Sequence, residues 1–153
     1  NLTGISLAQL LSLRTEGTRG GLPFGLSSNC CTGTASASGS LTYKRQRLDG
    51  ALSLSLDQTK LKLPIASRAL EFANANTTLK LGDAGWVLSP PLVLTDKRGD
   101  GKLTVSKAVA ASSAVGLRLE TKLLPLALAA PMLGCKPAGA GLEAKLIDGN
   151  WSC

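Results

Sequence analysis

Histidine is absent from the 153 residues of this chain, and its absence excludes several kinds of chemistry. No Ser–His or Cys–His pair is available for nucleophilic catalysis, and imidazole cannot contribute to a zinc site. The sequence also lacks a G-x-S-x-G elbow, a Walker-type phosphate loop and a dinucleotide-binding glycine fingerprint. We therefore expect a protein that is not an enzyme and that holds neither a metal nor another cofactor.

Aromatic residues and long apolar runs are also scarce. Aromatic rings supply the largest buried areas in protein cores, so this core has to be assembled mainly from leucine. The most apolar stretch, 123–133, is interrupted by Pro125 and Pro131 and is shorter than the ~20 residues of a membrane-spanning helix. We expect no transmembrane segment. Because the numbering begins at Asn1 and not at methionine, we expect that any signal or anchor peptide has either been removed or been left out of this sequence.

Acidic residues are outnumbered, with 10 Asp and Glu against 17 Lys and Arg, which gives a net charge of +7. Most of the basic residues stand singly, as Lys62 does between Leu61 and Leu63, and the one cluster is Lys44, Arg45 and Arg47 beside Tyr43. Nucleic-acid proteins carry denser basic patches with aromatic stacking platforms, so no nucleic-acid partner is expected. The cluster is predicted to be a solvated strand face, and peripheral contact with anionic lipid stays open.

What the sequence does contain is alternation of apolar and polar residues, the period of a half-buried strand. Leu52, Leu54 and Leu56 alternate with polar residues, and after Gln58-Thr59 the alternation resumes at Leu61. This predicts a hairpin that turns at Gln58-Thr59. Further strands are predicted over 41–47, 68–74, 77–81, 86–95 and 114–120, with one more starting at 103–105. Residues 142–147 are predicted to form a last strand or a short helical turn.

Three segments have their own expectations. Ser6 and Gln9 have capping-box spacing before an apolar face, which predicts a short helix over 5–13. The Ser-, Thr- and Ala-rich segment 27–40 is predicted to be a loop or an irregular strand. Pro90-Pro91 predicts that 86–95 bends or lies at a sheet edge. The expected fold is mainly β, an antiparallel sandwich or a curved sheet or barrel with a short N-terminal helix, stapled by disulfides, in one domain spanning 1–153.

The cysteines are Cys30, Cys31, Cys135 and Cys153. An even count, with one cysteine at the last position, favours disulfides in an oxidising compartment. A bond between neighbouring residues 30 and 31 would be strained, so each is predicted to reach one of the two distant cysteines and to clasp the chain ends together. The alternative is a Cys135–Cys153 bond that leaves the adjacent pair strained, free or linked to another chain.

The loop that begins at Asp96 carries two short motifs. It resembles an EF-hand or dockerin calcium loop through Asp96 and Asp100, but Arg98 stands at the third position and Lys107 at the twelfth, where a bidentate glutamate is required. A hairpin turn is therefore expected in place of a calcium site. The same loop spells Arg98-Gly99-Asp100, the tripeptide of integrin ligands, which makes Asp96, Arg98, Gly99 and Asp100 a candidate interaction loop.

These observations favour a structural or interaction module of an extracytoplasmic assembly, such as a filament, coat or envelope complex subunit. Its partners would be other protein subunits, paired by strand addition at edges such as 86–94. One alternative is a carrier for lipid or another apolar ligand, with a cavity lined by Leu54, Leu56, Leu61, Leu63 and Leu117. The other is an adhesin that acts through 96–102. The expected location is secreted, periplasmic or at the cell surface.

Overall fold

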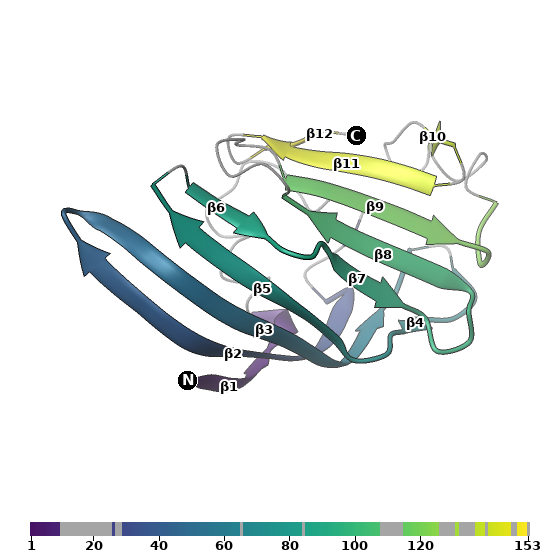
Figure 1. Cartoon of the computed structure of the whole chain (residues 1–153). Coiled ribbons are helices and arrows are strands. Elements are labelled where there is room, and N and C mark those ends of the chain that lie inside the picture. Colours follow the sequence, from purple (N-terminus) through teal and green to yellow (C-terminus); the bar gives the residue numbers. More distant parts are fainter. Residues whose placement is uncertain are drawn as a thin grey trace.

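The computed structural model describes residues 1–9, 26, 29–64, 66–83, 85–107, 115–125, 131, 137–139, 141–147 and 150–152. Strands dominate this part of the chain, and all their pairings are antiparallel, so the expected mainly β class is confirmed (Figure 1). The described strands do not close into a barrel. The strands are β1 (Leu2–Ser6), β2 (Cys31–Lys44), β3 (Arg47–Leu61), β4 (Leu70–Glu71), β5 (Ala75–Gly82), β6 (Gly85–Leu88), β7 (Leu92–Thr95), β8 (Gly101–Ser106), β9 (Val115–Thr121), β10 (Pro137–Ala138), β11 (Gly141–Ile147) and β12 (Asn150–Ser152).

The strands form two sheets of six. The first has the order β1-β2-β3-β5-β6, with β4 beside β3, and the second has the order β10-β11-β9-β8-β7, with β12 beside β11. In Figure 1 the two sheets follow one another as a curved layer, with β1 near one end and β12 near the other. We refer to them as the first sheet and the second sheet.

The two sheets meet at β6 and β7, which follow one another in the chain and are the terminal strands of their sheets. The predicted bend and edge position of 86–95 are therefore confirmed. The edge of β6 is nevertheless partly occupied, because the N–H of Leu88 donates to the Lys107 carbonyl at 3.1 Å. The expected strand addition at 86–94 is thus disfavoured at this point, where the second sheet already supplies an acceptor.

The predicted hairpin at Gln58-Thr59 is wrong. β3 continues through both residues, and its pairing with β2 shifts between Thr32, opposite Lys60, and Thr34, opposite Asp57. Gln58 has φ 51°, and the extra residue that it adds to β3 is a β-bulge. The bulge changes the phase of the alternation without turning the chain, so Leu56 and Leu61 both pack in the core.

The hairpin lies instead at Arg45 and Gln46, which connect β2 to β3 with positive φ at both residues. This is the geometry of a two-residue hairpin turn. The strand predicted over 41–47 is therefore divided by a turn. The segment predicted as a loop or irregular strand over 27–40 lies largely in the regular strand β2, because its small residues pair with β3 through the backbone. Glycine is required at Gly39, where a Cβ would collide with the carbonyl oxygen of Ala51.

The short N-terminal helix is present but begins later than predicted. Ile5 and Ser6 belong to β1, where Ile5 pairs with Ala35, and residues 7–9 are helical. The rest of the predicted helix, 10–13, lies outside the described residues. The remaining strand predictions are confirmed in β5, β8, β9 and β11, whereas only Leu70–Glu71 is a strand within 68–74.

The strand register places apolar side chains on one side of both sheets, which we call the inner face. Directly opposed residues of an antiparallel pair point to the same side, so the pairs can be followed from strand to strand. In the first sheet the inner face comprises Ala35, Ala37, Leu41, Tyr43, Leu48, Leu52, Leu54, Leu56, Leu79, Leu81, Trp86 and Leu88. In the second sheet it comprises Leu92, Leu94, Leu103, Val105, Val115, Leu117, Leu119, Leu142, Ala144 and Leu146.

The buried core covers only part of the inner face. Its fully buried members include Leu63, Leu70, Phe72, Leu119 and Leu142, and it takes in both sheets. In the first sheet the core reaches Ala75 and, at its margin, Leu56. Beyond this point Leu88 is still buried, but the leucines of β3 and β5 are half-buried. At the β2–β3 turn Leu41 is 42% exposed, Leu48 47% and Tyr43 68%. The inner face therefore has a covered half and an open half.

Candidate functional site

The candidate interaction loop connects β7 to β8 and is organised around Asp96. The Asp96 side chain has 0% exposure and forms an ion pair with Arg68 at 2.9 Å. Its carboxylate also accepts hydrogen bonds from the backbone N–H of Glu71 at 2.8 Å and of Arg98 and Asp100 at 3.2 Å. The Arg68 guanidinium, followed by these N–H donors, lowers the pKa of Asp96 to about 2. Asp96 is thus a buried anion whose charge is offset by one ion pair and three backbone hydrogen bonds.

Arg68 also binds Asp100, the acidic residue of the integrin-type tripeptide, at 2.5 Å. The two carboxylates raise the pKa of Arg68 further above its ordinary value. A guanidinium therefore occupies the position between the two aspartates that a calcium ion would need. Among the described residues no group of three or more His, Cys, Asp or Glu side chains is arranged to hold a metal. The geometry favours a structural turn over both a calcium site and a free adhesive loop.

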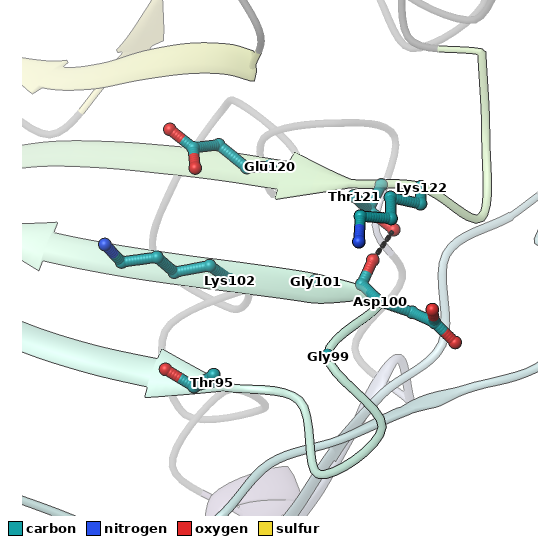
Figure 2. Close-up of a pocket in the computed structure, with 8 residues that line it drawn as sticks. All are labelled: Thr95, Gly99, Asp100, Gly101, Lys102, Glu120, Thr121 and Lys122. Carbon is teal, nitrogen blue, oxygen red and sulfur yellow. Dashed lines mark hydrogen bonds between the residues drawn. The ribbon is translucent and has the colours of Figure 1, made fainter.

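A shallow hollow of about 310 Å³ lies beside this loop. Figure 2 shows Lys102, Glu120 and Lys122 around it, with the Asp100 carboxylate directed away from Lys102. The hydroxyl of Thr121 donates to the Asp100 carbonyl at 2.9 Å and fastens the loop to β9. Arg118 lowers the pKa of Glu120, which keeps that carboxylate ionised. The side chains around the hollow include both signs of charge, and no nucleophile is paired with a base among them.

Of the four cysteines the structure describes two. Cys30 is buried and Cys31 half-buried, both are free thiols, and their sulfurs lie 2.8 Å apart. The hydrogen bond between them lowers the pKa of Cys30 and, together with burial, raises that of Cys31. Cys135 and Cys153 lie outside the described residues. No disulfide at bonding distance is seen in the described part of the chain, and the predicted clasp stays a prediction.

The basic cluster lies at the turn between β2 and β3, where Lys44, Arg45 and Arg47 are all exposed. Arg47 forms an ion pair with Asp83 at 3.0 Å, and both side chains are largely in solvent. Exposed pairs of this kind contribute little to stability. The expected solvated strand face is confirmed by this exposure.

An apolar cavity of about 270 Å³ opens on the inner face at the margin of the core. Its lining brings together Leu54 and Leu56 of β3, Leu92 of β7, and Ile5 and Leu7 from the N-terminal end of the chain. Its lining contains no charged residue; the complete set is Ile5, Leu7, Ala35, Ser36, Ala37, Leu54, Ser55, Leu56 and Leu92. It can therefore accommodate hydrocarbon and has no group to pair with a charge.

Of the residues predicted to line a ligand cavity, some line the observed cavity and others belong to the core. Leu54 and Leu56 line the cavity, whereas Leu61 and Leu63 are buried in the core and Leu117 packs against that core. Sequence reasoning missed Ile5 of β1, Leu7 of the short N-terminal helix and Leu92 of β7, which are distant in sequence from Leu54. It also missed Arg68, whose contact with Asp96 spans 28 residues of sequence. Alternation indicates which residues share a face, but it does not indicate where that face is left uncovered.

Comparison with known proteins adds no relative: no protein-family model, no curated protein and no solved structure matches this chain. In the described residues there is no helix long and apolar enough to cross a membrane.

Proposed function

We propose that this protein binds an apolar ligand containing an acyl chain on the open half of its inner face. The observation that carries the proposal is the cavity lined by Ile5, Leu7, Leu54, Leu56 and Leu92, which has the apolar lining typical of hydrophobic ligand sites. Its volume of about 270 Å³ is close to the lower end of the range of about 300–1,000 Å³ for small-molecule pockets.

The length of the open half supports an extended ligand. Leu48, Leu52, Leu54 and Leu56 follow one another along β3 on the inner face. Eight residues of strand separate the first from the last, which corresponds to roughly 26 Å at ~3.3 Å per residue. A bilayer hydrocarbon core of two opposed acyl chains is about 30 Å thick. One acyl chain, at half that thickness, therefore fits along the strand with room to spare.

The test is the binding of a neutral apolar dye such as Nile red. Leu54→Trp should fill the cavity and lower the affinity at least about tenfold, because the new ring competes for the same volume. Ser53→Trp is the matched control, since Ser53 is the preceding residue of β3 and points to the opposite, exposed face. A wild-type protein that binds no neutral apolar probe would overturn the proposal.

The second candidate is the expected interaction module, favoured by the position of β1. This strand is the terminal strand of the first sheet, and Leu2 within it is 60% exposed. Terminal strands with exposed apolar residues pair readily with a second chain. Sedimentation of the purified protein at increasing concentration tests this candidate, and a species that stays monomeric throughout argues against self-association.

Both candidate functions are compatible with secretion into an oxidising compartment and with the disulfide clasp, which we propose as well. The proposal is that Cys30 and Cys31 each bond to one of Cys135 and Cys153 in the mature protein, each bond closing a loop of roughly a hundred residues and stabilising the fold by ~4–5 kcal/mol. Peptide mapping of natively purified protein without reduction tests the connectivity. Recovery of free Cys30 and Cys31 peptides would exclude the clasp.

A further inference from the structure

The inner face also carries a charged residue outside the loop and the cavity described above, Lys107. It follows β8 directly and has the same alternation as Leu103 and Val105, which lie on the inner face. Lys107 is only 7% exposed, and its ammonium lies 3.9 Å from the centre of the Trp86 ring, which is also on this face.

No carboxylate pairs with Lys107 among the described residues. Burial alone lowers the pKa of this lysine, and no neighbouring charge offsets the effect. Buried lysines are almost always paired, because the cost of removing an ammonium from water must be compensated. A stacked ring compensates only part of that cost. The site therefore contains a buried cation that has no anionic partner among the described residues.

The location of Lys107 relative to the cavity supplies the second step. Trp86 pairs with Leu81, which in turn lies opposite Gly50 of β3, whereas the cavity lies at Leu54 and Leu56. Six residues of β3 separate Gly50 from Leu56, roughly 20 Å along the strand. Apolar residues occupy the row between them: Leu52, Leu79 and Leu88. A cation thus lies at one end of the open half and an apolar cavity at the other.

We propose that the ligand is an anionic amphiphile whose carboxylate or phosphate head binds the Lys107 ammonium beside Trp86, while its acyl chain extends over the row of leucines toward the cavity. This proposal rests on the proposed function, because it assigns a head group to the ligand whose chain the cavity takes. The head-group chemistry is that of an oxyanion on a hydrocarbon chain, found both in free fatty acids and in phosphate monoesters of lipids.

The experiment measures the displacement of Nile red from the full chain by three amphiphiles of equal chain length, delivered from cyclodextrin: palmitate, hexadecyl phosphate and hexadecanol. We expect at least one of the two anions to compete about tenfold better than the neutral alcohol, since a hydrogen bond to a charged group would add to chain burial. A preference for palmitate or for hexadecyl phosphate identifies the carboxylate or the phosphate as the head.

Lys107→Met retains the apolar stem and removes the charge. It should abolish the advantage of the anions over hexadecanol while leaving the affinity for the alcohol unchanged. Lys102→Met is the matched control, because Lys102 lies on β8 with its side chain on the opposite, exposed face; it should keep the advantage. Circular dichroism checks that each variant is folded.

Two failures can be told apart. If Nile red binds and all three amphiphiles compete equally, or Lys107→Met keeps the advantage of the anions, the head-group site is wrong and the apolar-ligand function stands. If Nile red does not bind at all, the proposed function itself fails, and the head-group proposal fails with it.

Discussion

Two buried charges flank β8, and they are held in opposite ways. Asp96, just before the strand, accepts three backbone hydrogen bonds and an ion pair from Arg68. Lys107, just after the strand, has a Trp86 ring beside it and no carboxylate among the described residues. The buried charge before β8 is therefore paired with an opposite charge, and the buried charge after β8 has no such partner among the described residues.

The same contrast separates the two halves of the inner face. Around Asp96 the core is covered, and Phe72 and Leu70 are fully buried beside it. Around Lys107 and Trp86, Leu79 and Leu81 of the first sheet remain half-buried, whereas Leu88 is buried. A large exposed apolar patch is typical of an interaction or ligand site, and a buried charge without a partner destabilises the fold. We therefore expect the covered half to contribute most to stability, and we place the proposed binding site in the open half.

The strongest test of the covered half is Asp96→Ala. Removal of the carboxylate leaves the N–H groups of Glu71, Arg98 and Asp100 without their acceptor, so we expect a loss of about 4 kcal/mol in the free energy of unfolding. Urea denaturation measures it. The control is Asp83→Ala, which breaks the exposed pair with Arg47 and should cost no more than about 0.5 kcal/mol. Equal losses in the two variants would remove the distinction between the halves.

A pair of leucines on β3 tests the same distinction within one strand. Leu61 is 3% exposed and Leu48 is 47% exposed. Leu61→Ala should lower the free energy of unfolding by about 3 kcal/mol, through lost burial and the cavity that remains. Leu48→Ala should change it by less than about 0.5 kcal/mol. Urea denaturation of both variants measures the ratio, and a comparable cost at Leu48 would show that the open half is covered in solution.

Acid should weaken the covered half. The pKa of Asp96 is about 2 in the folded protein, against an ordinary value of 3.8. Because the folded value is the lower one, this carboxylate contributes its full stability above about pH 4 and loses it as the pH falls toward 2, in total about 2 kcal/mol. Unfolding measured at pH 6 and pH 2 tests this. Asp96→Asn should differ from the wild type more at pH 6 than at pH 2, and a constant difference would contradict the assignment.

Much of this comparison was accessible from the sequence. Alternation identified the apolar face of β3 and named Leu54 and Leu56 as cavity-lining residues, which they are, and Pro90-Pro91 marked the bend at which the two sheets meet. Alternation failed at Gln58, because a bulge and a turn both interrupt a period of two and only the pairing partner distinguishes them. It also failed at Arg45-Gln46, because both residues have positive φ and neither is a glycine, the residue that usually indicates such a turn.

The candidate site was less accessible. The loop at Asp96 was recognised from the sequence, but its partner Arg68 is distant in sequence. Without that partner, the same residues fit a structural turn, a calcium loop and an adhesive tripeptide. Lys107 did carry a signal, since it continues the apolar alternation of Leu103 and Val105. A lysine at such a position extends its amine into solvent or becomes a buried cation, and only the packing of Trp86 against it decides between these outcomes.

The smallest expected effect is also the sharpest, because its sign is opposite to that at Asp96. Lys107→Met removes an unpaired buried charge and retains the apolar stem. The lost contact with Trp86 is worth about 1 kcal/mol, whereas the relieved cost of burying the ammonium is several kcal/mol in a dry site and less where water still reaches it. We therefore expect a net gain of about 1 kcal/mol in the free energy of unfolding, measured by urea denaturation of the ligand-free protein.

Lys102→Met serves as the control for this gain, since its ammonium is already in water and its loss should leave stability within about 0.5 kcal/mol of the wild type. A gain at Lys107 alone would mean that the chain retains a charge that destabilises its own fold, as is expected of a group kept for a ligand. A loss of about 1 kcal/mol or more would mean that the ammonium anchors the two sheets through Trp86. Lys107 would then stabilise the fold as Asp96 does, and the proposal of a head-group site in the open half would be wrong.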